Sequence, residues 1–184
     1  MKNMKNDSVK KVVATGIGAA LFFVLARFVA IPSGIPNTNI ALQYGIQAVF
    51  AVLFGPVVGA LSGFIGHILT DLTWGSVWWS WAFGTCVYGL IVGLFAKKIN
   101  IYDGNFGKSE IITYAVANLI ANIVAWPIIA AVGDVLIYKE PFSLVFAQLM
   151  VAAVADFACA MVVGGLILFG YSKTIAKSGS LDKE

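Results

Sequence analysis

The side chains that could bind a small molecule lie in an apolar segment that ends in a cluster of tryptophans. Gly63, His67 and Asp71 follow one another at intervals of four residues, so they share one face of a helix. Four indoles come directly afterwards, at Trp74, Trp78, Trp79 and Trp81. A carboxylate can accept a hydrogen bond from an amino group or a ring N–H, and indoles stack on flat rings. This segment therefore predicts the wall and rim of a pocket for a small heterocycle.

Amide side chains in other apolar segments repeat the four-residue spacing, at Gln43 and Gln47 and again at Asn118 and Asn122. Polar side chains are costly in hydrocarbon, and they normally face protein or a water-filled cavity. We therefore expect groups from separate segments to converge on one outward-facing vestibule, in which Gln47, Asp71 and Asn122 meet. The candidate substrate-binding residues are Asn37, Gln43, Gln47, His67, Asp71, Trp74, Trp78, Asn118, Asn122, Trp126 and Gln148.

Several of these residues also have a purely structural interpretation. Asn118 and Asn122 could hydrogen-bond across helices, and His67 could be a packing histidine. Tryptophans are frequent at membrane interfaces, so any one of them could belong to an interfacial belt instead of a binding site. The prediction of a pocket depends on the convergence of the set rather than on any single member.

The remaining ionisable and thiol groups do not form a catalytic motif. Asp156, deep in an apolar run, could pair with Arg27 or line the pocket wall, whereas Asp134 in a polar loop is expected to be solvated. With one histidine, no H-E-x-x-H motif and no nucleophile motif, we expect neither catalysis nor a metal or cofactor. Cys86 and Cys159 lie inside apolar runs and are interpreted as small buried hydrophobes.

The composition indicates that these groups are positioned by membrane-spanning helices. Of the 184 residues, 60% are hydrophobic and only 11% are charged, and the mean hydropathy is +0.90. A soluble domain of this size could not bury so much apolar surface. The net charge of +3 has no basic block, which argues against nucleic acid as a partner. We predict one all-α integral membrane domain with six spans, at about 9–31, 42–54, 56–72, 79–96, 111–132 and 142–171.

The connections set the expected orientation. The first run is too long for a signal peptide and is interrupted by Arg27, so we interpret it as a span. Turn-rich or polar loops are expected at Pro32 to Ile40, Lys97 to Lys108 and Gly133 to Pro141, with a polar tail from Ser172. Six spans place both termini on one side. Lysines favour the cytoplasm for that side, because the inner segments hold Lys2, Lys5, Lys10, Lys11, Lys97, Lys98, Lys108, Lys173, Lys177 and Lys183, and the outer loops only Lys139.

Small residues gather on the first span. The patch consists of Ala14, Gly16, Gly18, Ala19 and Ala20. Small residues four apart let membrane helices approach closely. The patch could contact another helix of the same chain or a partner protein. On the second interpretation, Gly18→Leu is expected to weaken assembly and leave substrate binding intact.

Three stretches, ATGIGAALFFVLARF, FGPVVGALSGFIGHILTDL and WGSVWWSW, resemble the substrate-binding S component of energy-coupling factor (ECF) vitamin transporters. The resemblance covers about residues 9–171, and GHILTD and SVWWSW are most similar to a family with members linked to hydroxymethylpyrimidine uptake. It implies partnership with a transmembrane T component and two cytoplasmic ATPases. It also implies that the small-residue patch, in which Gly16 and Gly18 replace the family's alanines, meets the T component. The loop from Pro32 to Ala41 is then the lid of the vitamin site.

The predicted function is therefore substrate capture, in the cell membrane, for an ECF-type importer of a small vitamin or vitamin precursor such as hydroxymethylpyrimidine. The chain has no Walker A sequence, so partner ATPases would supply the energy. A stand-alone secondary transporter of a heterocyclic metabolite is the alternative, although repeats and broken helices expected of one are not evident. A membrane enzyme using His67 and Asp71 is a third interpretation.

Overall fold

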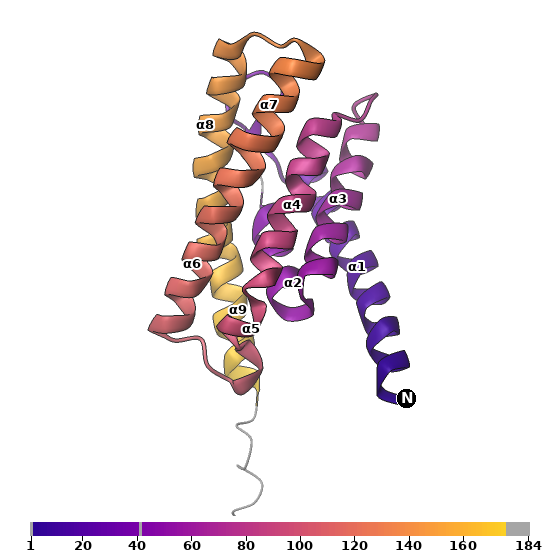
Figure 1. Ribbon diagram of the computed structural model, residues 1–184, viewed down its shortest axis with the longest axis vertical. Helices are drawn as coiled ribbons and strands as arrows, with labels where there is room; N and C mark the ends of the chain where they lie inside the picture. The colour runs from indigo at the N-terminus through magenta and orange to yellow at the C-terminus, as the bar shows by residue number, and fades with distance from the viewer. Residues whose placement is uncertain (1, 41, 176–184) are drawn as a thin grey trace, which may run out of the picture.

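The computed structural model of the protein describes residues 2–40 and 42–175, with side chains from Asp7 onward. Ala41, Lys177 and Lys183 of the predictions above lie outside the described residues. Nearly all of the described chain is helical, and the helices run roughly along one axis (Figure 1). The main helices are α1 (Lys2–Phe28), α2 (Gln43–Phe54), α3 (Pro56–Leu72), α4 (Trp79–Leu94), α6 (Lys108–Ile123), α8 (Phe142–Cys159) and α9 (Gly165–Thr174). The shorter elements are β1 (Ile31–Pro32), β2 (Asn39–Ile40), α5 (Ala96–Ile99), η1 (Ile101–Asp103), η2 (Val124–Ala130), α7 (Ala131–Gly133), η3 (Asp134–Tyr138) and η4 (Ala160–Gly164).

The lengths and surfaces of the helices are those of a membrane protein. Four continuous helical stretches are long and apolar enough to cross a bilayer: Asp7–Phe28, Trp79–Asp103, Lys108–Tyr138 and Phe142–Thr174. α2 and α3 are apolar but shorter. Large hydrophobic side chains such as Val12, Leu119 and Leu166 are exposed on the outside of the bundle. That arrangement is stable where lipid replaces water, so the protein is an all-α, multi-pass membrane protein.

The connection predicted from Gly133 to Pro141 is mostly helical, which corrects the sequence-based boundary. The helix that begins at Lys108 continues through η2, α7 and η3 as far as Tyr138. Pro127 is accommodated in η2, a π-helical segment whose wider turn tolerates a missing backbone N–H. The segment from Lys97 to Lys108 is also more ordered than a solvent loop, because it contains α5 and η1 and buries Ile99 and Ile101.

A small β-hairpin interrupts the all-α pattern in the loop after α1. β1 and β2 pair antiparallel, with Ile31 opposite Ile40 and Pro32 opposite Asn39. The Ser33 hydroxyl closes the turn by donating to the Thr38 carbonyl at 2.5 Å. The sequence of this loop predicted turns but not the strand pairing, because each strand has only two residues.

The shortness of α2 makes room for a cavity. Its 12 residues span about 18 Å, against about 30 Å for the hydrocarbon core of a bilayer. The first turn of α2 therefore lies inside the bundle, where Tyr44 is buried, whereas most residues of the hairpin loop are exposed. α3 and α4 pack closely because glycines meet where they cross: a Cβ on Gly89 would lie 2.0 Å from the Gly59 carbonyl oxygen.

The small residues of α1 do not form one external face. Ala14 and Ala19 are buried, and a Cβ on Gly18 would lie 2.9 Å from atoms of Phe50 and Ser62. These three residues pack within the chain, which was the first of the two interpretations above, so we no longer include Gly18 in the docking interpretation. Gly16 has no atom within 4 Å of its Cβ position, and Ala20 is exposed.

Candidate functional site

A cavity of about 560 Å³ lies among α1, the hairpin loop, α2, α3, α4, η3 and α8. Its walls include the end of α3 at Asp71 and the connection around Glu140. Both lie at the end of the bundle opposite the beginning of α1 (Figure 1). Small-molecule sites typically measure about 300–1,000 Å³ and are lined by aromatic groups with a few polar ones. The cavity has the size and lining of such a site.

Seven of the predicted residues line the cavity, and four do not. The seven come from different elements: Asn37, Gln43, His67, Asp71, Trp74, Trp78 and Gln148. The other four lie in helix contacts elsewhere: Gln47, Asn118, Asn122 and Trp126. The expectation that Gln47, Asp71 and Asn122 meet in one vestibule is therefore wrong.

Gln47 is excluded from the cavity because it joins α2 to α3 and α4. Its Nε2 donates to the Gly59 carbonyl at 3.0 Å and to the Thr85 carbonyl at 2.8 Å. The side chain occupies the space that a residue larger than glycine would fill at position 63, where a Cβ would lie 1.9 Å from Gln47 Nε2. Gly63 thus makes room for a structural amide instead of contributing to a pocket wall.

Asn118, Asn122 and Trp126 form a chain of hydrogen bonds along α6 and η2. Asn122 Nδ2 donates to the Asn118 carbonyl, and Trp126 Nε1 donates to Asn122 Oδ1, both at 2.8 Å. Tyr88 of α4 donates to Asn118 Oδ1 at 2.5 Å. The Trp126 ring is fully buried and stacks on Trp81, with 5.4 Å between centroids. Asn118 therefore hydrogen-bonds across helices, as the structural interpretation proposed, whereas Asn122 bonds to residues of its own continuous helix.

His67 and Asp71 combine a packing role with a place in the cavity wall. His67 Nδ1 lies 2.8 Å from the Thr85 hydroxyl, which also contacts the Tyr44 hydroxyl at 3.1 Å. His67 Nε2 lies 3.6 Å from Asp71 Oδ1. Asp71 Oδ2 accepts the backbone N–H of Trp78 at 2.9 Å, which fixes the connection between α3 and α4. Both carboxylate oxygens of Asp71 therefore have protein neighbours.

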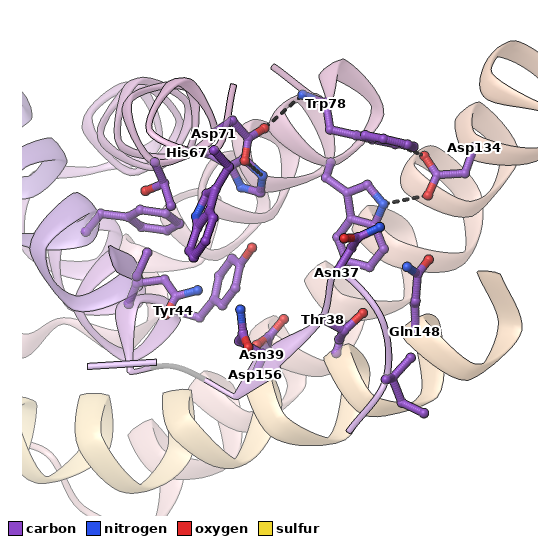
Figure 2. A pocket seen from close by; sticks show the side chains of 18 of the residues that line it. Asn37, Thr38, Asn39, Tyr44, His67, Asp71, Trp78, Asp134, Gln148 and Asp156 are labelled. Atoms are coloured by element: carbon purple, nitrogen blue, oxygen red, sulfur yellow. Dashed lines mark hydrogen bonds and ion pairs between the residues drawn. The ribbon is translucent and has the colours of Figure 1, made fainter. Parts of the chain in front are cut away.

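The environment of Asp134 differs most from the one that the sequence analysis predicted. It was expected to be solvated, but it is 1% exposed and lines the cavity. Its Oδ1 accepts a hydrogen bond from Trp78 Nε1 at 2.7 Å and its Oδ2 accepts one from Trp81 Nε1 at 2.6 Å (Figure 2). Oδ1 also accepts a hydrogen bond from the Ser80 hydroxyl. Asp134 thus fixes two cavity-lining indoles. Only the folded chain brings them together, since the partners are separated by more than fifty residues.

Asp156 also lines the cavity, which decides between its two earlier interpretations. It is 3% exposed, and its buried Oδ2 has no hydrogen-bond partner. Arg27 does not pair with it; the guanidinium lies over the Trp74 ring, 4.4 Å from the centroid. Gln43 Oε1 is a second buried atom in the cavity lining without a partner.

The hairpin loop covers one side of the cavity. Asn37, Thr38 and Asn39 line it, and Gln148 Nε2 on α8 donates to the Pro36 carbonyl at 2.9 Å. Asn37 has a φ of 56°, a left-handed conformation that asparagine tolerates better than most residues. Thr38, Phe22 and Tyr44 are cavity residues that the sequence analysis did not propose.

Comparison with known proteins identifies the family. A sequence model described as "ECF-type riboflavin transporter, S component" matches residues 6–173. The chain belongs to this family of ECF S components. As an ECF S component it is a membrane transport protein, not an enzyme, and the family associates with a T component and ATPases. Among the described residues, no group of three or more His, Cys, Asp or Glu side chains could hold a metal ion.

Relatives of this S component carry a name that states no ligand. A "UPF0397 protein" of Streptococcus gordonii is 49% identical over 178 residues, covering 96% of this chain and 95% of the relative. Proteins of the same name from Lactobacillus johnsonii and Lactococcus lactis subsp. cremoris are 46% and 48% identical, covering 100% and 98% of this chain and all of each relative. No solved structure gives a significant match to this S component.

Proposed function

We propose that this S component captures a small flat heterocycle in the cavity and presents it for import. The observation that carries the proposal is the cavity itself: about 560 Å³, lined by Trp78, Trp81 and Tyr44 together with polar groups from several elements. Aromatic faces can stack on a flat ring, and the polar groups can fix its orientation. Hydroxymethylpyrimidine and riboflavin are the two ligands to test first, the former from the resemblance of the motifs and the latter from the family description.

We further propose that the chain crosses the membrane six times, with both termini in the cytoplasm. α2 and α3 would complete the crossings, α2 together with the hairpin loop that precedes it. The start of α1 and the end of α9 lie at the same end of the molecule (Figure 1). That end carries Lys97 and Lys98 of α5 and Lys108 at the start of α6, whereas Lys139 lies at the opposite end. This distribution supports a cytoplasmic location for the lysine-rich end and an external opening for the cavity.

The exposed small residues of α1 are proposed to meet the T component, which the two ATPases then drive. Gly16 and Ala20 lie four apart on the outer side of α1, with open space around Gly16. Small side chains at this spacing allow another membrane helix to approach. Gly16→Leu is expected to abolish co-purification of the T component and ATPases. Gly170→Leu, also at an open position, is the control and should leave co-purification intact.

Substrate capture is tested by equilibrium binding of tritiated hydroxymethylpyrimidine and of riboflavin to the purified protein. We expect one of them to bind, and Trp78→Ala to weaken that binding at least tenfold, because the variant removes a cavity-lining ring. Trp79→Ala is the matched control, since Trp79 is exposed and is not part of the cavity lining. Failure of both compounds to bind, or equal affinity for the Trp78 variant, would contradict the proposal.

A further inference from the structure

We infer that Asp156 binds an N–H donor or a positively charged part of the ligand, and that the cavity rejects anionic ligands such as phosphate esters. This inference rests on the proposed function, because it concerns the same cavity. It adds the chemical class of the ligand and assigns the residue that recognises it.

Asp156 has a buried carboxylate oxygen without a hydrogen-bond partner. Asp71 accepts the Trp78 backbone N–H and faces His67, and Asp134 accepts three side-chain donors. Asp156 is almost fully buried, at 3% exposed, but in contrast to the other two its Oδ2 has no donor. A carboxylate oxygen removed from water without a hydrogen bond is costly. A donor on a bound molecule would remove that cost, so the site is incomplete without one.

Other polar residues of the lining lie around Asp156. Figure 2 shows its carboxylate beside Asn39 of the hairpin loop, in the part of the cavity next to the Tyr44 ring. Gln43 also lines the cavity and has a buried Oε1 without a partner. Two acceptors without donors thus belong to one cavity. An amino group, a ring N–H or a protonated ring nitrogen would satisfy them, whereas a ligand carbonyl or phosphate oxygen would not.

The charges around the cavity point in the same direction. Its lining contains four acidic residues, Asp71, Asp134, Glu140 and Asp156, and the described lining residues include no lysine or arginine. The guanidinium of Arg27, the one arginine in the sequence, lies over the Trp74 ring at the rim. A cavity walled by one sign of charge favours ligands of the opposite sign and repels those of the same sign. A phosphate ester inside the cavity would meet no lysine or arginine among the described lining residues.

The inference is tested by comparing each alcohol with its own phosphate ester. Hydroxymethylpyrimidine, hydroxymethylpyrimidine phosphate, riboflavin and riboflavin 5′-phosphate are the probes, and each dissociation constant is measured on the purified full-length protein. For whichever alcohol binds, we expect the ester to bind at least tenfold more weakly. Asp156→Asn keeps the shape of the side chain but removes its charge, and it should also weaken binding of the alcohol at least tenfold. Asp103→Asn, an exposed acid outside the cavity, is the control and should bind as the unaltered protein does.

The outcomes separate this inference from the proposed function. An ester that binds as tightly as its alcohol would overturn the exclusion of anions, although capture of a heterocycle would stand. Binding to Asp156→Asn within twofold of the unaltered protein would overturn the role of Asp156. If the Asn variant fails to fold, as judged by its elution and thermal unfolding, the comparison of ester and alcohol on the unaltered protein still decides. If neither alcohol binds, the proposed function itself is contradicted.

Discussion

Removal of the Asp134 carboxylate tests whether this residue holds the cavity wall together. Asp134→Ala leaves the indole N–H groups of Trp78 and Trp81 and the Ser80 hydroxyl without their acceptor. A buried polar group that loses its partner costs about 1–3 kcal/mol, and the two indoles, which are only partly buried, lie at the low end of that range. The expected loss is about 3 kcal/mol. At about 2–4 °C per kcal/mol for a chain of this size, the midpoint of thermal unfolding should fall by about 6–12 °C.

Asp134→Asn provides a graded comparison. Its single carbonyl oxygen can replace Oδ1, which serves Trp78 and Ser80, but its NH2 group faces the Trp81 N–H in place of Oδ2. One hydrogen bond is lost, so the destabilisation should be about a third of that in the alanine variant. The assay is thermal unfolding in detergent, followed by tryptophan fluorescence. A midpoint for Asp134→Ala within 1 °C of the unaltered protein would refute the reasoning, as would an asparagine variant less stable than the alanine variant.

Three further predictions follow from the packing and from the loop over the cavity. Gly89→Ala should destabilise the protein by about 1–3 kcal/mol, because the new Cβ would meet the Gly59 backbone at 2.0 Å; Gly165→Ala, where the space is open, should not change thermal unfolding. Gln47→Ala should lower stability by about 1–3 kcal/mol, since the two hydrogen bonds from Nε2 to α3 and α4 are lost. The dissociation constant of the ligand should nevertheless change less than twofold, and a large loss of affinity would place Gln47 in the site after all. Gln148→Ala removes the hydrogen bond that joins α8 to the Pro36 carbonyl of the hairpin loop. The rate of ligand release should rise up to about tenfold, as measured in a stopped-flow or filter assay. An unchanged release rate would show that this bond does not hold the loop.

Much of the fold was predictable because it follows from local patterns. The Gly55-Pro56 corner and the apolar run after it predicted α3 with its observed bounds, Pro56–Leu72. The end of the helix that begins at Lys108 was not predictable in the same way. Asp134 and the residues around it have the composition of a loop, but the Asp134 carboxylate finds three donors on the α3–α4 connection and α4. Tertiary hydrogen bonds there outweigh local polarity.

The site was harder to predict than the fold, because a four-residue spacing shows only that two side chains share a helix face. The spacing of Asn118 and Asn122 is the same as that of His67 and Asp71, but the amides face α4 and η2 while the latter pair faces the cavity. Which face turns inward depends on how the helices pack. The packing in turn depends on contacts between glycine and its neighbours, such as that of Gly63 with Gln47, which one sequence does not reveal.

The most direct measurement is an experimental structure of the protein bound to hydroxymethylpyrimidine or riboflavin, whichever binds. The account predicts the ligand ring in the cavity beside Trp78 and under the hairpin loop, with an N–H group within hydrogen-bond distance of Asp156 Oδ2. A ligand bound instead in a second pocket, lined by residues that include Leu119 and Ala153, or anywhere else outside the cavity, would contradict it.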